Sequence, residues 1–351
     1  MNSNSPLWRS MLFIPAHRDD FVGKASQRGA DAYVLDLEDS VPEALKNEAR
    51  EAVVNAADIV AQDGAAALVR INQGLSQATA DLEACVHPGV QAIVVPKVVS
   101  GSQLQELSAH IDKLEAERSI AQGHTRLIAQ IECVHGLANL DDIAGSSNRL
   151  LGMSLGSEDF SASAGMEPTP EGLLAPNQAI VFACRRAGIS PFGFPASIAN
   201  YSDIDRFRDT IHFARQLGFV GALCIHPSQV AILNEEFAPS DAEIERARAL
   251  ASVLPEDAQN VFVALTASGL RPGLRIIARA EDPNTESKLI RSGATDVVLP
   301  TSSGAERIAD LLAHPDVASM LETIGRRGHI ERELGTIGLQ LEQLVVPEGS
   351  R

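Results

Sequence analysis

Short runs of apolar residues alternate along the chain with longer segments in which apolar residues recur every three or four positions. The short runs are typical of buried parallel strands, and the longer segments are typical of the amphipathic helices that connect them. Segments 42–60 and 102–118 are two of these predicted helices. The eight predicted strands lie at residues 11–15, 33–37, 67–71, 92–95, 127–131, 150–155, 191–194 and 221–225. Eight such units predict an α/β fold with a closed (β/α)₈ TIM barrel.

The pattern changes after the eighth unit. A last amphipathic segment at 240–250 begins with Ser240 and carries Glu243 at the third helical position, which is the capping-box signature of a helix start. The composition then shifts between Leu250 and Asp257, and two further strands are predicted at 274–280 and 295–300. We therefore predict a barrel domain at 1–252 and a partial Rossmann-like α/β appendage at 253–351.

Composition and charge exclude several classes of function. The net charge of -17 makes a nucleic acid an unexpected partner, because an acidic surface repels phosphate backbones. No apolar stretch approaches the ~20 residues of a membrane span, and the N-terminus lacks a signal-peptide pattern. The four cysteines have no CxxC spacing and are predicted to be reduced core residues of a cytoplasmic protein. They are Cys85, Cys133, Cys184 and Cys224.

Polar residues stand where the predicted strands end. Catalytic groups of a (β/α)₈ barrel lie at the C-terminal ends of the strands, whereas packing alone would favour Val, Ile or Leu there. This arrangement predicts a site at that end of the barrel. The residues concerned are Asp36, Glu38, Asp39, Arg70, Asn72, Lys97, Gln130, Glu132, Glu158, Asp159 and His226.

Glu132 and Asp159 follow neighbouring predicted strands, so their carboxylates can converge. Two carboxylates completed by water and substrate oxygens suit Mg²⁺. Zn²⁺ is disfavoured because His226 is the only histidine at a strand end and no thiolate accompanies it. Arg70 offers a planar fork for a carboxylate. Together these groups would stabilise an enolate, since a metal polarises a carbonyl next to the developing charge.

Each of these residues also has a structural alternative. Glu132 and Asp159 would then be an acid cluster paired with Lys97 and Arg70, with Arg70 acting only as an ion-pair partner. Glu38 and Asp39 would only cap the helix that follows. His226 would be a turn residue before a proline, and His17 and Arg18 would be surface groups.

The strand ends resemble a known family. The segments RSMLFIPAHRDDF, YVLDLEDSVPEALKNEAR, VRIN, VVPKV, AQIE, LGSEDF and GFVGALCIHPSQVAILNEEFAPS occur in the same order in the citrate lyase beta subunit-like family. This family belongs to the HpcH/HpaI aldolase superfamily and includes citryl-, malyl- and citramalyl-CoA lyases. The resemblance covers about residues 7–250. Related class II aldolases end the second strand in Glu-His, so LDLED favours the lyase branch.

The resemblance implies roles for individual residues. Glu132 and Asp159 match the Mg²⁺ ligands, and Arg70 matches the arginine that grips the substrate carboxylate. Glu38 and Asp39 match acids near the metal. In addition, the resemblance implies a catalytic role for Lys97 at the mouth of the active site, and CoA-phosphate contacts for Arg18 and Lys24.

The implied reaction is Mg²⁺-dependent cleavage of a 3-hydroxyacyl-CoA to an acyl-CoA and an α-keto acid. The expected partners are therefore these small molecules. Lyases of this group carry a DGxMID-like segment after the barrel, whose aspartate acts in acid/base chemistry, and no such motif occurs here. Two alternatives stay open: a free-acid aldolase on the same metal site, and an inactive barrel with a regulatory or assembly tail.

The tail resembles a different family. Residues 257–317 are similar to the second half of an RCK domain of the TrkA type, and the similarity continues more weakly to residue 351. No GxGxxG turn occurs in the chain, so we do not predict nucleotide binding by the tail. The barrel family forms oligomers and RCK-like halves pair, so the resemblances imply a homo-oligomer.

Overall fold

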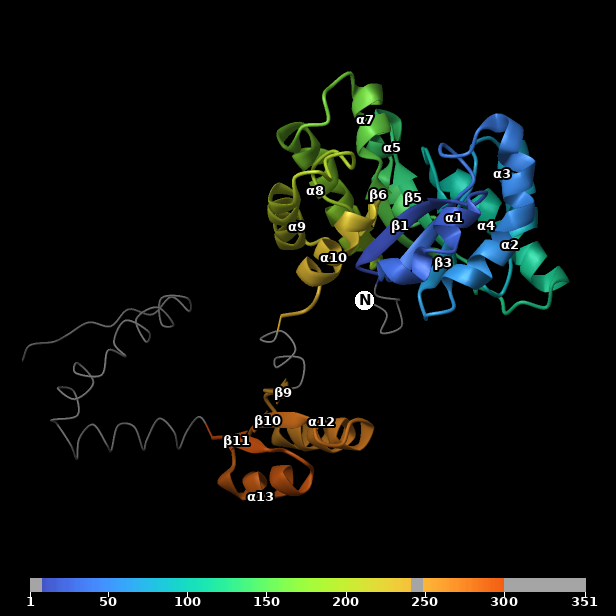
Figure 1. Cartoon of the computed structure of the whole chain (residues 1–351). Helices are drawn as coiled ribbons and strands as arrows, with labels where there is room; N and C mark the ends of the chain where they lie inside the picture. Colours follow the sequence, from blue (N-terminus) through green and yellow to red (C-terminus); the bar gives the residue numbers. More distant parts are fainter. Residues whose placement is uncertain (1–7, 241–248, 300–351) are drawn as a thin grey trace, which may run out of the picture. The chain divides into compact units, whose positions relative to one another are not determined.

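The computed structural model describes residues 8–240 and 249–299 of the chain. The described residues fall into two compact units, divided after Ala238 (Figure 1). No helix in the described part of the chain is long and apolar enough to cross a membrane.

The first unit is a nearly closed barrel of eight parallel strands in the order β7-β6-β5-β4-β3-β2-β1-β8. Each strand therefore lies beside its successor, and the last returns to the first. Every strand overlaps one of the eight predicted apolar runs, which confirms the (β/α)₈ prediction. The strands are β1 (Ser10–Pro15), β2 (Ala32–Asp36), β3 (Ala66–Arg70), β4 (Ala92–Val95), β5 (Arg126–Ile131), β6 (Leu150–Leu155), β7 (Ser190–Phe192) and β8 (Ala222–Cys224).

Helices surround this barrel, with α2, α3 and α4 on one side and α8, α9 and α10 on the other (Figure 1). The predicted helix at 42–60 begins at Lys46, because Glu43–Leu45 forms a 3₁₀ turn after Pro42. The helical elements are α1 (Asp19–Val22), a 3₁₀ helix (Ala25–Arg28), α2 (Lys46–Val60), α3 (Leu75–Cys85), α4 (Gly101–Glu117), α5 (Val134–Ala138), α6 (Leu140–Ala144), α7 (Ser157–Ala164), α8 (Pro170–Ala187), α9 (Ile204–Leu217) and α10 (Pro227–Glu236).

The seam between β7 and β8 is the least regular part of the barrel. A single bridge joins Phe192 to Gly221, and the amide of Gly193 donates to the Gly221 carbonyl over 2.9 Å. A Cβ atom at Gly221 would lie 2.0 Å from the backbone oxygen of Trp8. Only glycine therefore fits where the chain passes so close to the start of β1.

The strands separate two apolar cores. On β3, the alternation places Leu68 inside the barrel and Val69 against the surrounding helices. The next inward position is Arg70, so the inward face changes from apolar to polar toward the C-terminal ends of the strands. The buried core inside the barrel consists of Trp8, Met11, Ala32, Val34, Leu68, Ala92, Val94, Ile128, Leu151, Phe192 and Leu223.

Three of the four cysteines are buried as predicted, and all four are free thiols. Cys133 differs, because it is only half-buried and stands at the N-cap of α5. Its Sγ accepts a hydrogen bond from the Gly136 amide. The prediction of a core position was therefore wrong for this cysteine, since the helix start that follows β5 holds it at the barrel rim.

Within the described residues, the second unit contains a three-stranded parallel sheet in the order β11-β10-β9, with helices α12 and α13. The predicted strands at 274–280 and 295–300 are confirmed as β10 and β11. An apolar core between the sheet and helices α12 and α13 includes Ala264, Ile276 and Leu289. The elements are β9 (Ala249–Ser252), α12 (Asp257–Leu270), β10 (Arg275–Arg279), α13 (Pro283–Arg291) and β11 (Asp296–Val298).

The predicted helix at 240–250 is wrong at its end, and residues 241–248 of it lie outside the described residues. Leu250 belongs to β9 and pairs with Ile276 of β10. The capping signature is a local signal, whereas the strand depends on a partner distant in sequence. Because β9 joins the second sheet, the contacts divide the chain after Ala238 rather than at the expected 252/253 boundary.

Candidate functional site

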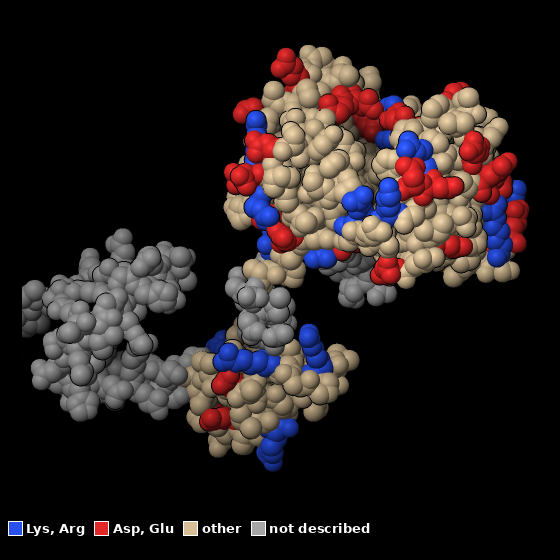
Figure 2. Space-filling view, viewed as in Figure 1, with Lys and Arg blue, Asp and Glu red and all other residues tan. Residues whose placement is uncertain are grey.

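A cavity of about 790 Å³ opens at the C-terminal ends of the barrel strands. Polar side chains from β2, β3, β5 and β6 line one part of it, and apolar residues of β1 and of the segments after β7 and β8 line the rest. Figure 2 shows acidic and basic side chains interspersed over the visible face of the barrel, with acidic groups at a central recess. This is the end of the barrel where the sequence predicted a site.

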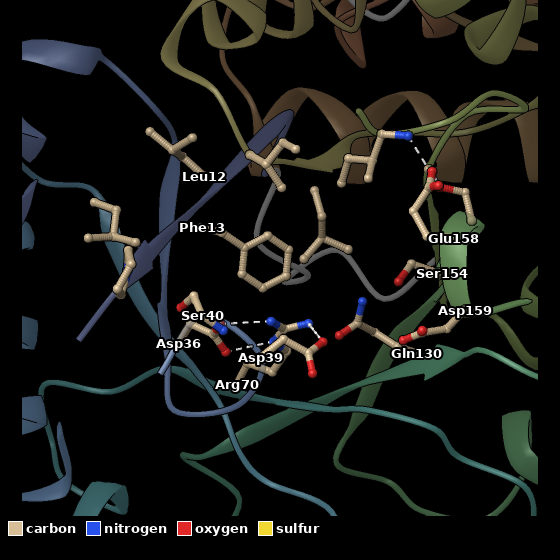
Figure 3. A pocket seen from close by; sticks show the side chains of 18 of the residues that line it. Leu12, Phe13, Asp36, Asp39, Ser40, Arg70, Gln130, Ser154, Glu158 and Asp159 are labelled. Atoms are coloured by element: carbon tan, nitrogen blue, oxygen red, sulfur yellow. Dashed lines mark hydrogen bonds and ion pairs between the residues drawn. The ribbon is translucent and has the colours of Figure 1, made fainter. Parts of the chain in front are cut away.

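Arg70 is held at the end of β3 by Asp36 of β2. Its Nε and Nη2 each lie 2.7 Å from a carboxylate oxygen of Asp36, and the guanidinium stacks on the Phe13 ring at 4.6 Å (Figure 3). Burial opposes the charge of Asp36, but the hydrogen bonds and charge of Arg70 lower the pKa of Asp36 below its usual value. The sequence analysis missed this partner. Strand register was the available signal, because Asp36 and Arg70 are opposed on paired strands.

The remaining nitrogen of Arg70 faces other acids. Nη1 lies 3.3 Å from Glu38 Oε2 and 3.4 Å from Asp39 Oδ2. Glu38 is buried, whereas Asp39 is exposed and lines the cavity. Since Asp36 occupies the bidentate edge of Arg70, the Nη1 edge is the one open to a substrate carboxylate.

Lys97 lies among three carboxylates. Its backbone amide donates to Glu132 Oε2 over 3.1 Å, and its Nζ lies 3.7 Å from Glu38 Oε1 and 3.5 Å from Asp159 Oδ2. A φ of 51° puts Lys97 in the left-handed region, which turns the chain after β4 and directs this amide at Glu132. The structure thus brings together Glu38, Lys97, Glu132 and Asp159, which the sequence analysis had selected from four separate strand ends.

Glu132 is the most perturbed acid of this cluster. Burial, then the charges of Glu38 and Asp159, raise its pKa to about 8, against the opposing charges of Arg70 and Lys97. Gly156 makes room for the side chain, because a Cβ there would lie 2.6 Å from Glu132 Cγ. Burial also raises the pKa of Glu38, whose Oε2 accepts no hydrogen bond. The cluster therefore has more negative charge than its cations offset.

A divalent cation with oxygen ligands fits this excess of charge. Among the described residues, no three His, Cys, Asp or Glu side chains already converge as a metal site. Two carboxylates contact Lys97 instead: Glu132 accepts a hydrogen bond from its backbone amide, and Asp159 lies beside its ammonium. Mg²⁺ is commonly held by one or two carboxylates and keeps several waters, so this donor set suits it without a third protein ligand.

The remaining predicted residues are distributed unevenly around the cavity. Lys24 lines it, but Arg18 does not, because Arg18 pairs with Asp20 at 2.9 Å on an exposed surface. Arg28 also lines the cavity and was missed. Arg28 ends the short 3₁₀ helix that begins after Lys24. The sequence signal that could have revealed it was a second basic residue four positions after Lys24.

His226 has the structural role that the alternative described. Its Nδ1 accepts a hydrogen bond from the Ser228 amide as the N-cap of α10, and its ring stacks on Tyr201 at 4.5 Å. Glu158 and Ser154 line the cavity and were not assigned roles from the sequence. Glu158 accepts hydrogen bonds from Ser197 and Ser157, at 2.6 and 3.2 Å.

Comparison with known proteins places the barrel in a family. The profile of the HpcH/HpaI aldolase/citrate lyase family matches residues 9–227. Citrate lyase subunit beta of Leuconostoc mesenteroides subsp. cremoris is 32% identical over 283 residues, which is 80% of this chain and 93% of that protein. The L-malyl-CoA/beta-methylmalyl-CoA lyase of Rhodobacter capsulatus is 34% identical over 273 residues, covering 70% and 84% of the two chains. The chain belongs to the HpcH/HpaI aldolase/citrate lyase family.

A solved structure agrees with this assignment. Protein CitE from Mycobacterium tuberculosis, in complex with magnesium and pyruvate, superposes with a TM-score of 0.53 at 26% identity. The match covers 66% of this chain and 91% of that one. The predicted resemblance to the citrate lyase beta subunit is therefore confirmed.

The tail similarity is also confirmed. The TrkA-N domain profile matches residues 200–300. This range begins inside the barrel, before β8, and ends after β11. The fold divides the range, because β8 pairs with β1 of the barrel whereas β9, β10 and β11 form their own sheet. An alternation of strands and helices runs through both parts, which is the pattern a Rossmann-like domain shares with a barrel.

Proposed function

We propose that this protein is a Mg²⁺-dependent carbon–carbon lyase that cleaves a 3-hydroxyacyl-CoA of the malyl-, citramalyl- or citryl-CoA type. The products are an acyl-CoA and an α-keto acid. One observation carries the proposal: Glu132, buried and short of positive charge, lies with Glu38 and Asp159 around Lys97 at the strand ends, beside Arg70. The named substrates and ligands of the relatives support the same chemistry.

Glu132 and Asp159 would hold the metal ion, with the keto acid and water as its other ligands. When bound there, Mg²⁺ supplies a Lewis acid that polarises the carbonyl oxygen of the keto acid. The proposal needs both carboxylates ionised, and the raised pKa of Glu132 reflects burial and like charges that a divalent cation offsets.

Arg70 would bind the substrate carboxylate through its Nη1 edge, where Glu38 and Asp39 now lie at 3.3 and 3.4 Å. Asp36 and the Phe13 ring fix the guanidinium plane, so the carboxylate meets a donor that is already oriented. Lys97 holds an ammonium within 3.7 Å of Glu38 and Asp159. We propose that it shifts toward the substrate oxygen when the metal neutralises these acids.

Lys24 and Arg28 are the cations that would meet the phosphates of CoA. Both line the cavity, together with Phe21 and apolar residues of β1. Arg18, which the resemblance also suggested, pairs with Asp20 instead. Our proposal therefore assigns phosphate binding to Lys24 and Arg28 rather than to Arg18.

The decisive experiment is a turnover assay with the full chain, Mg²⁺ and a panel of malyl-, citramalyl- and citryl-CoA. We expect keto-acid release that requires Mg²⁺ and is lost in Asp159→Ala. Glu106→Ala is the matched control, because Glu106 is an exposed acid on α4 and should leave turnover unchanged. Absence of release from every substrate by folded protein, with no Mg²⁺ binding, would refute the proposal.

The barrel and the appendage, which the sequence divided at 252/253 and the contacts divide after Ala238, are proposed as separate domains, and the appendage is assigned no nucleotide. The homo-oligomer implied by the two resemblances also stays a prediction. Light scattering on the purified full chain tests it, and a monomeric mass would contradict it.

A further inference from the structure

Two buried polar side chains line the cavity on the barrel side. Gln130 of β5 and Ser154 of β6 are opposed in the register of the two strands, and they are 5% and 1% exposed. Within the described part of the chain, Gln130 Oε1 and Ser154 Oγ have no hydrogen-bond partner. Buried polar groups are normally paired, so these two atoms indicate a bound molecule that satisfies them.

Packing does not explain the polarity of these two residues. Ile128, the preceding inward residue of β5, belongs to the apolar core inside the barrel. An apolar side chain at position 130 or 154 would extend this core and would avoid the cost of burying an unpaired polar group. The explanation therefore has to come from what binds in the cavity.

The keto acid is not a suitable partner for both atoms. Malyl-, citramalyl- and citryl-CoA would release glyoxylate, pyruvate and oxaloacetate, which have in common only a carboxylate and a carbonyl group. Both of these groups accept hydrogen bonds and donate none, whereas the amide oxygen of Gln130 needs a donor. A water molecule has two donor hydrogens and can therefore satisfy Gln130 Oε1 and Ser154 Oγ at once. Adjacent strands lie about 4.8 Å apart, so one small molecule can reach both side chains.

The two side chains adjoin the proposed metal ligands. Gln130 stands two residues before Glu132, on the same inward face of β5. Ser154 stands two residues before Gly156, whose backbone lies against the Glu132 side chain. Figure 3 shows Gln130 and Ser154 on the same side of the cavity as Asp159. Since Mg²⁺ takes six oxygen ligands and usually keeps several waters, two carboxylates and a keto acid leave room for water at this place.

We propose that Gln130 and Ser154 are positioning residues that hold one water ligand of the Mg²⁺ ion bound by Glu132 and Asp159. We refer to Gln130 and Ser154 as the water-holding pair. This inference rests on the proposed function and refines its metal site. A water whose oxygen binds a metal ion donates two hydrogen bonds, one to Gln130 Oε1 and one to Ser154 Oγ. The pair contacts the water and not the keto acid, so it serves all three keto acids alike.

Calorimetric titration of the full chain with MgCl₂ tests the pair. Ser154→Ala and Gln130→Met should each weaken Mg²⁺ binding by about tenfold, the lower end of the loss that follows removal of a partner of a metal ligand. Because both residues hold the same water, the double variant should lose little more than either single variant. The ratio of glyoxylate to pyruvate affinity in saturating Mg²⁺ should stay as in the wild-type protein.

The stability of the metal-free protein separates this role from a structural one. Each substitution removes a polar atom that is unpaired in the metal-free fold, so the urea midpoint without metal should not fall below that of the wild type. Ser161→Ala is the matched control and should bind Mg²⁺ as the wild type does. Ser161 is a buried serine of α7 whose Oγ also lacks a partner among the described residues, and it is not part of the cavity lining.

The outcomes distinguish this inference from the proposed function. Wild-type Mg²⁺ affinity in both single variants, with binding lost in Asp159→Ala, would overturn the water-holding pair and leave the lyase proposal standing. Additive losses in the double variant, a changed ratio of glyoxylate to pyruvate affinity, or a lowered metal-free midpoint would do the same. Failure of the wild-type protein to bind Mg²⁺ would overturn both.

Discussion

The two sides of the barrel mouth differ in how their charges are matched. On one side, Asp36 and Arg70 form two hydrogen bonds of 2.7 Å under the Phe13 ring, and the pair is complete without any ligand. On the other side, Glu38, Glu132 and Asp159 share one ammonium group, and Glu132 carries a strongly raised pKa. We refer to these as the arginine side and the acid side.

This difference indicates that the arginine side has a structural role and the acid side a chemical one. The arginine side is fixed by the fold and presents one oriented donor, whereas the acid side lacks positive charge until a cation and a substrate arrive. Perturbed pKa values gather at functional sites for this reason. The predictions below test the two sides in turn.

The largest effect is expected on the arginine side, from Asp36→Ala. Arg70, whose side chain is 12% exposed, would lose its main partner. Loss of one member of a buried ion pair destabilises a protein strongly, so we expect the free energy of unfolding to fall by roughly 3 kcal/mol. Denaturation in urea measures this. Asp20→Ala, which breaks the exposed pair with Arg18, is the control and should leave the midpoint unchanged. Equal midpoints for the two variants would contradict the proposed contrast.

On the acid side, Glu132→Gln should lower the affinity for Mg²⁺ by about 100-fold. Even mutation of residues that only hydrogen-bond to a metal ligand lowers metal affinity by up to about 100-fold. The variant keeps the shape of the side chain and its contact with the Lys97 amide. Calorimetric titration with MgCl₂ measures the effect. Unchanged affinity would place the metal elsewhere and remove Glu132 from the proposed ligands.

The pH dependence of metal binding follows from the pKa of Glu132, about 8 in the metal-free fold. The folded protein binds this proton more tightly than the unfolded chain does, so protonated Glu132 stabilises the metal-free fold. That stability is lost as the pH rises toward 8. Mg²⁺ needs the ionised form, so its affinity should rise about tenfold per pH unit below pH 8 and then level off.

Thermal melts with and without MgCl₂ at pH 6, 7 and 8 provide the measurement. We expect the metal-induced increase in Tm to grow with pH in the wild-type protein and to vanish in Glu132→Gln. A Tm increase of constant size across this range would show that no proton is displaced from Glu132.

The smallest effect is expected from Lys97→Gln. The Lys97 ammonium lies 3.5 Å from Asp159 and 3.7 Å from Glu38, so it competes with an added cation for their charge. Its removal should strengthen Mg²⁺ binding by about fivefold while reducing turnover, since a unit charge at this distance contributes on the order of 1 kcal/mol in water. Weaker Mg²⁺ binding in this variant would mean that Lys97 supports the metal site rather than competing with it.

The local sequence pattern was sufficient to predict the strands of the barrel and most of the residues that line its cavity. The eight apolar runs matched the barrel strands, and seven of the eleven polar residues at their ends line the cavity, namely Asp36, Asp39, Arg70, Gln130, Glu132, Glu158 and Asp159. This worked because a parallel barrel requires continuous apolar strands, while polar groups are tolerated only where the strands end. The helix expected at 240–250 failed at its end because β9 depends on pairing with β10.

The sequence by itself thus determined the fold class, the family and the set of ionisable residues at the strand ends. Only the tertiary structure decided how those residues combine. The register of β2 and β3 pairs Arg70 with Asp36. The left-handed turn at Lys97 directs its amide at Glu132, and its ammonium lies near Glu38 and Asp159. Burial then raised the pKa of Glu132. Register, burial and distance depend on segments far apart in the chain, which is why no local pattern could specify them.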